Sequence, residues 1–593
     1  MSTGQQLTPN THVLSSLTQA HTNTSHRIGF TPSTLRQARA HSSAHLWQTA
    51  LDKELLGLQE RGTWTPVDMS QLPPHTNILD TKLTFTDKDS GPRVRLVARG
   101  DQEYPKATDI AKFAPTPAAT EVRLIIWIAT ENAWSLLTAD ISQAFVQSDD
   151  LDQTKPYYIR LPKGVTIPGT EHPPSTVYKL KKPLYGLAIS SKAWSDTLKK
   201  FLFHNNFNSV NCSDTLFVYT QSKTVILFLA HVDDCLITGT PRHALDNIIE
   251  KLLSRFQGRN EGEAKRFVGV NIHRDTSSRQ GCHTTTISQE HLTQALLDEH
   301  KDEVLTTALT PMSPGTLLLP TKDDHPVVHD PKLTKKYQRL CGSMMYLSVW
   351  TRPDISFAVQ QLAKYMANPQ PHHWDAAIRL LRYLKHTPKM GITYRRSYRG
   401  PDHRLYAFAD SDFAACPITR RSYNAFLTML GGGVISWRCR QQKSVATSTT
   451  ESEFVAASNC ADEVLWIRRI LEYFAPQTGP TPLFEDNRAC RMLSENPVRN
   501  ERTKHLDYRV HSLRERVRDG VVTLIDCPTK DMLADALTKA LPSPAFTRHR
   551  DTMMGNRHHP LIYQPPRATH TPPRAISVEH PLAHSTRGSN EDE

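Results

Sequence analysis

Two adjacent carboxylates, Asp233 and Asp234, stand between the short apolar runs 225–229 and 235–237. Runs of this length and β-branched content predict buried strands. A tight turn between them would hold both acids at the tip of a hairpin. Two anions beside buried strands need a neutralising partner, and Mg²⁺ prefers carboxylate and phosphate oxygens. The pattern therefore indicates either a magnesium site or a solvated Asp-Asp turn.

Other acids also stand at the ends of predicted strands or on helices near them. Asp140 closes the predicted strand 136–141, a position that suits either a metal ligand or a helix N-cap. Four more acids lie in the C-terminal third of the chain, at Asp410, Glu453, Asp486 and Asp535. Asp410 and Asp486 follow short predicted strands, and Glu453 lies near the start of a long predicted helix, 451–474.

Basic side chains gather on one face of two predicted elements. The strand 93–99 alternates, so that its arginines point one way and its apolar residues the other. The predicted helix 373–385 carries Arg379, Arg382 and Lys385 on one face. Guanidinium groups in a row suit phosphate contact, but a solvated basic face explains both patterns equally well.

The composition favours a polyanionic partner. The 593 residues include 71 Lys and Arg against 59 Asp and Glu, a net charge of +12. This balance is typical of nucleic-acid-binding proteins, although it also fits a merely basic soluble protein. The nine cysteines show no zinc-ligand spacing, which favours a reducing compartment. We expect no secretory signal and no membrane span, because no apolar run is long enough.

The elements that must position these residues fall into successive segments. Residues 1–35 are polar and predicted to be disordered. Strands and helices alternate up to about residue 275, and helices then dominate at 335–349, 354–366 and 373–385. A further domain with α/β alternation begins near Arg404, and it includes a predicted helix at 531–541. From Ser543 the chain is rich in Pro, His and Arg, which predicts a disordered basic tail.

With these residues laid out, the chain resembles the polymerase part of Ty1/copia-type retrotransposon polyproteins from about Trp47 to Leu541. The resemblance rests on motifs in a fixed order. Before residue 400 they are Arg95-Leu-Val-Ala-Arg-Gly100, Phe113-Ala-Pro115, Asp140-Ile-Ser-Gln-Ala-Phe145, Leu184-Tyr-Gly-Leu187, His231-Val-Asp-Asp234, Thr351-Arg-Pro-Asp-Ile355 and Leu381-Arg-Tyr-Leu-Lys385.

The C-terminal motifs resemble the ribonuclease H of the same family. They are Ala409-Asp-Ser-Asp412, Ser436-Trp437, Ser448-Thr-Thr-Glu-Ser-Glu-Phe454, Glu485-Asp-Asn487, Arg502-Thr-Lys-His505 and Ala534-Asp535. The resemblance implies an α/β and α+β multidomain chain. A right-hand polymerase with palm, fingers, thumb and connection would be followed by an RNase H-like α/β domain. The implied boundaries are 36–275 for fingers and palm, 276–400 for thumb and connection, and 401–542 for RNase H.

The resemblance also implies the site residues and their ligands. Asp140, Asp233 and Asp234 would hold two Mg²⁺ ions in a polymerase site, and Mn²⁺ could replace them. Asp410, Glu453, Asp486 and Asp535 would hold two more in a hybrid-cleaving site. For the nucleotide, Arg95 is expected to hold the triphosphate and Phe145 to exclude a ribose 2′-hydroxyl, next to Tyr185 and Gly186. His505 would handle product.

The expected function is RNA-directed DNA polymerase with ribonuclease H activity. Its partners would be an RNA template, a primer-template, an RNA–DNA hybrid and dNTPs, without a membrane, and with integrase or a second copy as further possibilities. The expected location is cytoplasmic, within virus-like particles, or nuclear.

Three departures from the family pattern keep other interpretations open. Ala188 and Ile189 replace the usual Lys and Gln, and His231 replaces the usual Tyr. The chain could therefore be a non-catalytic nucleic-acid-binding remnant, and a nuclease without polymerase activity is a third possibility. It could equally be a fragment, a cleavage product or a co-opted copy, because no gag, protease or integrase part is present.

Overall fold

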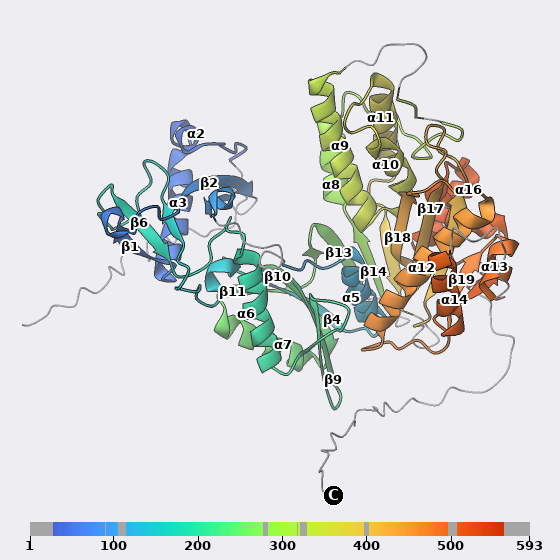
Figure 1. Cartoon of the computed structure of the whole chain (residues 1–593), viewed down its shortest axis with the longest axis horizontal. Coiled ribbons are helices and arrows are strands. Elements are labelled where there is room, and N and C mark those ends of the chain that lie inside the picture. Colours follow the sequence, from blue (N-terminus) through green and yellow to red (C-terminus); the bar gives the residue numbers. More distant parts are fainter. Residues whose placement is uncertain are drawn as a thin grey trace, which may run out of the picture.

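The computed structural model describes residues 28–88, 91–104, 114–276, 283–316, 318–320, 329–396, 403–495 and 507–562. These residues form a mixed α/β architecture with four β-sheets. Figure 1 shows the first sheet at the left, the second in the middle and the fourth at the right. Within the described ranges, no helix has the length and apolar character that a membrane crossing requires.

The first sheet has the strand order β1-β6-β5-β2-β3. Its strands are β1 (Trp64–Asp68), β2 (Ile78–Lys88), β3 (Gly91–Ala98), β5 (Tyr158–Arg160) and β6 (Thr176–Leu180). Helices α2 (Leu35–Ala40) and α3 (Ala44–Glu60) accompany it. Trp47, Leu51, Leu55 and Leu58 recur every three or four residues, so α3 buries one continuous apolar face in the core that it shares with β3.

The second sheet carries the hairpin acids and has the order β11-β4-β10-β9-β8-β7. Its strands are β4 (Ser135–Ile141), β7 (Asn208–Ser209), β8 (Leu216–Gln221), β9 (Thr224–His231), β10 (Asp234–Thr240) and β11 (Gly258–Glu263). Alternate residues of β9 enter two different cores. One core also contains α6 (Ser190–His204) and α7 (Arg242–Arg255), and the other contains α5 (Ala119–Glu131). The sheet is therefore covered on both faces.

Helices dominate the next part of the chain, as predicted from the sequence. They are α8 (Glu290–Glu299), α9 (Pro331–Trp350), α10 (Ser356–Ala363) and α11 (Pro371–His386), and they share one core. Asp330 caps α9 by accepting hydrogen bonds from two of its first backbone N–H groups, with proline at the first helical position. A third sheet, with the order β12-β13-β14-β15, lies beside them. Its strands are β12 (Arg266–Phe267), β13 (Val270–Asp275), β14 (Thr284–Ser288) and β15 (Gly391–Arg395).

The fourth sheet has the order β18-β17-β16-β19-β20. The strands β16 (Tyr406–Asp412), β17 (Tyr423–Leu430) and β18 (Gly433–Gln441) are antiparallel, whereas β19 (Thr481–Glu485) and β20 (Val522–Asp526) run parallel to β16. The long helix α12 (Thr449–Leu471) packs on this sheet, together with α13 (Arg488–Glu495) and α14 (Asp507–Arg518). The first strand of this α/β unit, β16, begins at Tyr406.

The C-terminal end of the chain corrects two predictions. Ser543 was expected to open a disordered tail, but it is the first residue of helix α16 (Ser543–Met553). Phe546 and Met553 are seven residues apart, about two helical turns, and both are buried. The composition of this stretch hid this short amphipathic pattern, so the prediction of disorder is wrong for 543–562. The predicted helix 531–541 is reduced to α15 (Asp535–Thr538) and a preceding turn.

At the N-terminal end, order also begins before the predicted residue 36. The side chain of Thr34 caps α2 by accepting a hydrogen bond from the backbone of Gln37. The expected His505 lies outside the described residues.

Candidate functional site

The hairpin acids lie where two strands of the second sheet meet. Asp234 stands directly opposite Asp140 in the antiparallel pairing of β10 with β4. Val232 adopts a left-handed conformation, with φ of 54°, at the turn between β9 and β10. The backbone N–H of Ile141 donates to the carbonyl of Asp233 at 2.9 Å, and the Trp194 indole donates to the carbonyl of Val232. The turn is therefore fixed to the strand that carries Asp140.

These three carboxylates repel one another. Burial, followed by the neighbouring Asp233 and Asp140, raises the pKa of Asp234 from 3.8 to about 6. Arg259, on the neighbouring strand β11, lies 3.4 Å from a carboxylate oxygen of Asp140. The sequence analysis did not identify Arg259, and only its cross-strand pairing with Asp140 reveals it. The donor set fits a divalent cation, because hard oxygen ligands with excess negative charge lie at the neighbouring ends of β4 and β10.

The residues predicted to contact a nucleotide lie together beside the hairpin. The Arg95 guanidinium lies over the Tyr185 ring, 4.8 Å from its centroid, and the Phe145 ring lies 4.8 Å from Tyr185 on another side. Burial raises the pKa of the Tyr185 hydroxyl, and the charge of Asp233 acts in the same direction. The Arg95 Nε is buried and has no hydrogen-bond partner among the described residues. This arrangement is one cationic and aromatic wall next to the acids.

Gly186 has a structural reason to be glycine. Its φ is +93°, and a Cβ atom at this position would stand 2.1 Å from the backbone oxygen of Ala98. The N–H of Ala98 donates to the carbonyl of Tyr185 at 2.7 Å. The loop around Tyr185 is therefore held against β3, the strand that carries Arg95.

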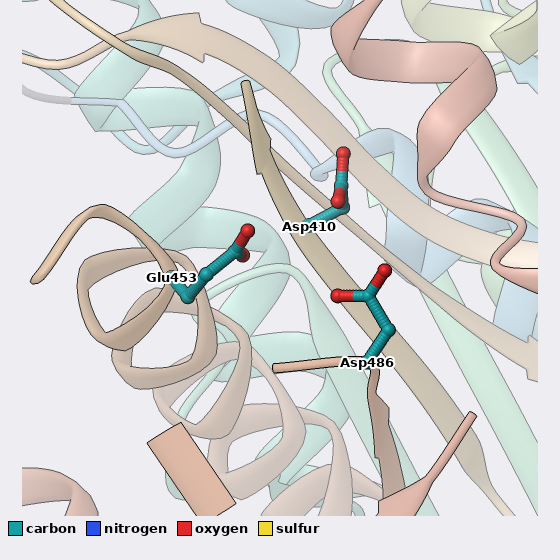
Figure 2. A group of neighbouring side chains, drawn as sticks. All are labelled: Asp410, Glu453 and Asp486. Atoms are coloured by element: carbon teal, nitrogen blue, oxygen red, sulfur yellow. The ribbon is translucent and has the colours of Figure 1, made fainter. Parts of the chain in front are cut away.

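The second group of acids converges from three elements. One ligand oxygen from each of Asp410 on β16, Glu453 on α12 and Asp486 after β19 lies within 4.8 Å of the other two. Figure 2 shows the three carboxylates pointing toward a common space. In the part of the chain that the structure describes, no other trio of acidic, His or Cys side chains is gathered this tightly.

Burial and the neighbouring carboxylates raise the pKa of Asp410 and of Glu453. Burial, then Glu485 and Asp410, raises the pKa of Glu453 from 4.5 to about 11. The Glu453 Oε2 atom is buried and has no hydrogen-bond partner among the described residues. An orphaned buried carboxylate oxygen among other carboxylates requires protons or a cation. The residues therefore fit a divalent cation.

The fourth predicted acid lies beside this trio with a cationic partner. Asp535 on α15 forms an ion pair with Lys539 at 2.8 Å. Burial and then Asp410 raise the pKa of Asp535 to about 7, while Lys539 opposes the shift. The Thr538 hydroxyl donates to Asp410, and the Thr529 hydroxyl donates to Asp486 at 3.0 Å. The structure thus places all four predicted acids around one space.

Sequence analysis missed Lys539 and Glu485. The spacing of Asp535 and Lys539, one helical turn apart, is a signal that could have revealed the lysine. Glu485 lies in β19 directly before Asp486 and is fully buried. Burial raises the pKa of Glu485 well above its usual value. Nothing in the local pattern distinguishes this acid from a solvated one.

Comparisons with known proteins find sequences similar to most of this chain. A family profile described as "Reverse transcriptase (RNA-dependent DNA polymerase)" matches residues 62–312. The "Retrovirus-related Pol polyprotein from transposon RE1" of Arabidopsis thaliana is 33% identical over 84% of this chain and 33% of its own length. The corresponding polyprotein from transposon TNT 1-94 of Nicotiana tabacum is 29% identical over 87% of this chain and 38% of its own length.

Among solved structures, a foamy viral protease-reverse transcriptase in complex with RNA/DNA hybrid aligns with a TM-score of 0.44 and 12% identity. The alignment covers 82% of this chain and 54% of that chain, a likeness too distant to assign a role to any residue.

Residues 62–312 match the reverse transcriptase family, and the chain is similar to Ty1/copia-type Pol polyproteins over most of its length. It spans about a third of the length of these curated relatives.

Proposed function

We propose that this chain is an RNA-directed DNA polymerase that also cleaves the RNA strand of an RNA–DNA hybrid. The observation that carries the proposal is the presence of two separate groups of acids, each at strand ends of its own sheet or on helices beside that sheet. One group is Asp140, Asp233 and Asp234, and the other is Asp410, Glu453, Asp486 and Asp535. Two-metal phosphoryl chemistry needs such carboxylate groups. The net charge of +12 suits the proposed nucleic-acid partners.

In the proposed polymerase site, the second sheet serves as the palm. Asp140, Asp233 and Asp234 would hold the metal ions. Arg95 would bind the triphosphate, because its Nε has no hydrogen-bond partner among the described residues and its guanidinium lies over the Tyr185 ring. Phe145 would lie under the sugar and exclude a 2′-hydroxyl by bulk, supported from behind by the Tyr185 ring.

In the proposed nuclease site, the fourth sheet serves as the RNase H-like domain. Asp410, Glu453, Asp486 and Asp535 would hold the ions, and the Thr538 and Thr529 hydroxyls would orient Asp410 and Asp486. Lys539 would limit the negative charge around Asp535. At both sites, bound Mg²⁺ supplies activation of the attacking oxygen and neutralises phosphate charge.

The departures from the family pattern are compatible with this proposal. The backbone N–H of Ala188 donates to Glu103 at 2.8 Å, so the loop is held there without a polar side chain. Ile189 packs against the apolar core of the first sheet. Burial lowers the pKa of His231, which favours its neutral form. None of the residues Ala188, Ile189 and His231 is one of the acids of the two sites. We expect these departures to affect the catalytic rate.

Primer extension on an RNA template, with purified protein and Mg²⁺, tests the polymerase. We expect extension by the natural chain and none by Asp233→Asn, which keeps the side-chain shape but removes a charge. Cleavage of a labelled RNA–DNA hybrid tests the nuclease in parallel, with loss expected in Asp486→Asn. Each variant is the control for the other, because each should keep the activity of the other site.

Other outcomes would redirect the proposal. Hybrid cleavage without extension would leave a nuclease alone. Silence in both assays, together with tight binding that weakens steeply as salt rises, would indicate a non-catalytic nucleic-acid-binding remnant.

A further inference from the structure

A buried carboxylate lies behind the proposed polymerase site without being one of its acids. Glu54 on α3 is 6% exposed. Its Oε2 accepts a hydrogen bond from the Gln143 side-chain amide at 2.6 Å, and its Oε1 accepts one from the backbone N–H of Leu96 at 3.2 Å. A buried carboxylate is costly to keep unless such bonds satisfy it. Both of its oxygens are therefore committed.

The two hydrogen bonds join two segments that carry proposed nucleotide contacts. Gln143 lies between Asp140 and Phe145 and adopts a left-handed conformation, with φ of 50°. Leu96 follows Arg95 directly on β3. Glu54 is thus a bridge between the turn that presents Phe145 and the strand that presents Arg95.

The surface of α3 is shaped for this bridge. Gly57 lies one turn after Glu54, and a Cβ atom there would stand 3.3 Å from the Gln143 amide oxygen and 3.1 Å from Arg61. Arg61, one further turn along, donates to the side chain of Gln257. Glu54 and Gly57 on α3, and Arg61 directly after this helix, therefore all lie beside the turn that contains Gln143.

Residues around the turn complete the same network. The Ser142 N–H donates to the carbonyl of Gln257 at 2.9 Å, and the Gln147 amide donates to the carbonyl of Ser142 at 2.6 Å. The Gln257 N–H donates to the Gln147 side chain at 2.7 Å. Each of these groups takes part in a hydrogen bond of 2.6 to 2.9 Å, so we expect the turn to stay fixed relative to α3.

We propose that Glu54 is a positioning residue for nucleotide selection: its two hydrogen bonds set Phe145 relative to Arg95, and thereby set the preference for deoxyribose over ribose. This inference rests on the proposed polymerase function. Glu54 itself touches no substrate. Burial raises the pKa of Glu54, and its hydrogen bonds with Gln143 and Leu96 and the charges of Arg93 and Arg95 oppose this shift.

The variants separate the hydrogen bonds from the mere presence of a buried side chain. Glu54→Leu removes both acceptors, and Gln143→Leu removes the donor from the other side. Glu54→Gln retains a hydrogen bond at each end, because the Gln143 amide can turn to accept from the new amide. Thr81→Val is the matched control, since its buried hydroxyl donates to Arg160 at 2.6 Å within the same sheet but lies outside the network.

The measurement is the Kd of the next correct dNTP, and of its ribonucleotide, on a complex of protein with a dideoxy-terminated primer-template and Mg²⁺. This readout needs no turnover. We expect Glu54→Leu and Gln143→Leu each to reduce the ratio of the ribonucleotide Kd to the dNTP Kd about tenfold, a change of about 1.4 kcal/mol, because a displaced Phe145 no longer excludes the 2′-hydroxyl. The ratio of the two Kd values in the double variant should equal that in either single variant, because both substitutions remove the same hydrogen bond between Glu54 and Gln143. Glu54→Gln and Thr81→Val should keep the natural ratio of the two Kd values.

An unchanged ratio in both leucine variants would overturn the inference, and so would a Glu54→Gln variant as impaired as Glu54→Leu. If Glu54→Leu does not fold, Gln143→Leu tests the inference by itself, because Gln143 is only half-buried and its substitution should disturb folding less. Tight dNTP binding without primer extension would contradict the proposed polymerase function. The comparison of Kd values would still test the role of Glu54 in that case. Absence of nucleotide binding by the natural chain would overturn both.

Discussion

At the scale of single residues, the backbone around the proposed nucleotide site leaves no room for a side chain at Gly186. Its positive φ and its closeness to the Ala98 oxygen are separate obstacles. Gly169 shares the positive φ of +75° but has open space where a Cβ would stand. Alanine substitutions at these two glycines therefore distinguish the free-energy cost of the left-handed conformation from the cost of steric overlap with the backbone.

We predict that Gly186→Ala lowers stability more than Gly169→Ala does. The left-handed conformation alone costs an alanine about 1 to 2 kcal/mol, and overlap with backbone adds to this at Gly186. Thermal unfolding of both variants measures the difference, and primer extension should fall only in Gly186→Ala. Equal unfolding temperatures would show that the loop relaxes away from β3 without cost.

Glu485 offers a second prediction at this scale. Its Oε2 atom is buried and has no partner among the described residues, and Glu485 is the largest charged influence on Glu453. The Glu485→Gln variant keeps the acceptor for the Asn487 N–H, seen at 3.1 Å, and adds a donor that can face Glu453.

We expect Glu485→Gln to raise the unfolding temperature of the metal-free protein, corresponding to about 1 to 3 kcal/mol. The added stabilisation on titrating Mg²⁺ should shrink, because less negative charge then attracts the ion. Asp519→Asn, at an acid far more exposed to solvent, serves as the control. A lower unfolding temperature without metal would contradict the prediction.

At the scale of elements, the start of α11 depends on a neutral histidine. The Gln370 N–H donates to Nδ1 of His373 at 2.9 Å, and Nε2 of His373 lies 2.8 Å from the carbonyl of Leu319. The ring must therefore accept at Nδ1 and donate at Nε2, which only the neutral form can do. Burial accordingly lowers the pKa of His373 from 6.5 to about 4.

This depressed pKa predicts a loss of stability in mild acid. The unfolded chain binds the proton first, so the contribution is complete above pH 6.5 and is lost as the pH falls toward 4. Between pH 7.5 and 5.5 the loss from His373 should be about 1.4 kcal/mol. Urea unfolding at both pH values, followed by fluorescence, compares the natural chain with His373→Asn. Identical pH dependence in the two proteins would exclude this role of His373.

At the scale of the whole molecule, α5 joins the second sheet to the fourth. Arg123 on α5 is buried, donates to the carbonyls of Val349 and Trp350 at 3.0 Å each, and lies 4.0 Å from the centroid of the Trp437 ring on β18. Burial lowers its pKa to about 10, so it remains charged at neutral pH. The two proposed active sites therefore rest on one continuous core.

We predict that Arg123→Met destabilises both halves together, by about 3 kcal/mol or more, since the carbonyls of Ile435, Val349 and Trp350 lose their donor. Unfolding monitored separately through primer extension and hybrid cleavage should show both activities lost at the same lowered temperature. Arg160→Met, at an exposed arginine of the first sheet, is the control. Loss of one activity well before the other would show that the halves are independent.

Local sequence patterns predict much of this architecture. Short apolar runs predicted the hairpin around Asp233 and Asp234, and the predicted helices 335–349, 354–366 and 373–385 correspond to α9, α10 and α11. The acids at strand ends and the ordered motifs indicated both groups of carboxylates. These signals succeed because strand and helix periodicity are expressed within a few neighbouring residues.

The amino-acid sequence by itself determined the family, the candidate acids and most elements, but not which distant side chains meet. The pairing of Arg259 with Asp140, the bridge from Glu54 to Gln143, and the burial of Glu485 beside Glu453 arise only from the tertiary structure. So does the packing of α16 in a stretch whose composition suggested disorder. Cross-strand register and shared cores bring together residues far apart in the chain, and no local periodicity encodes such contacts.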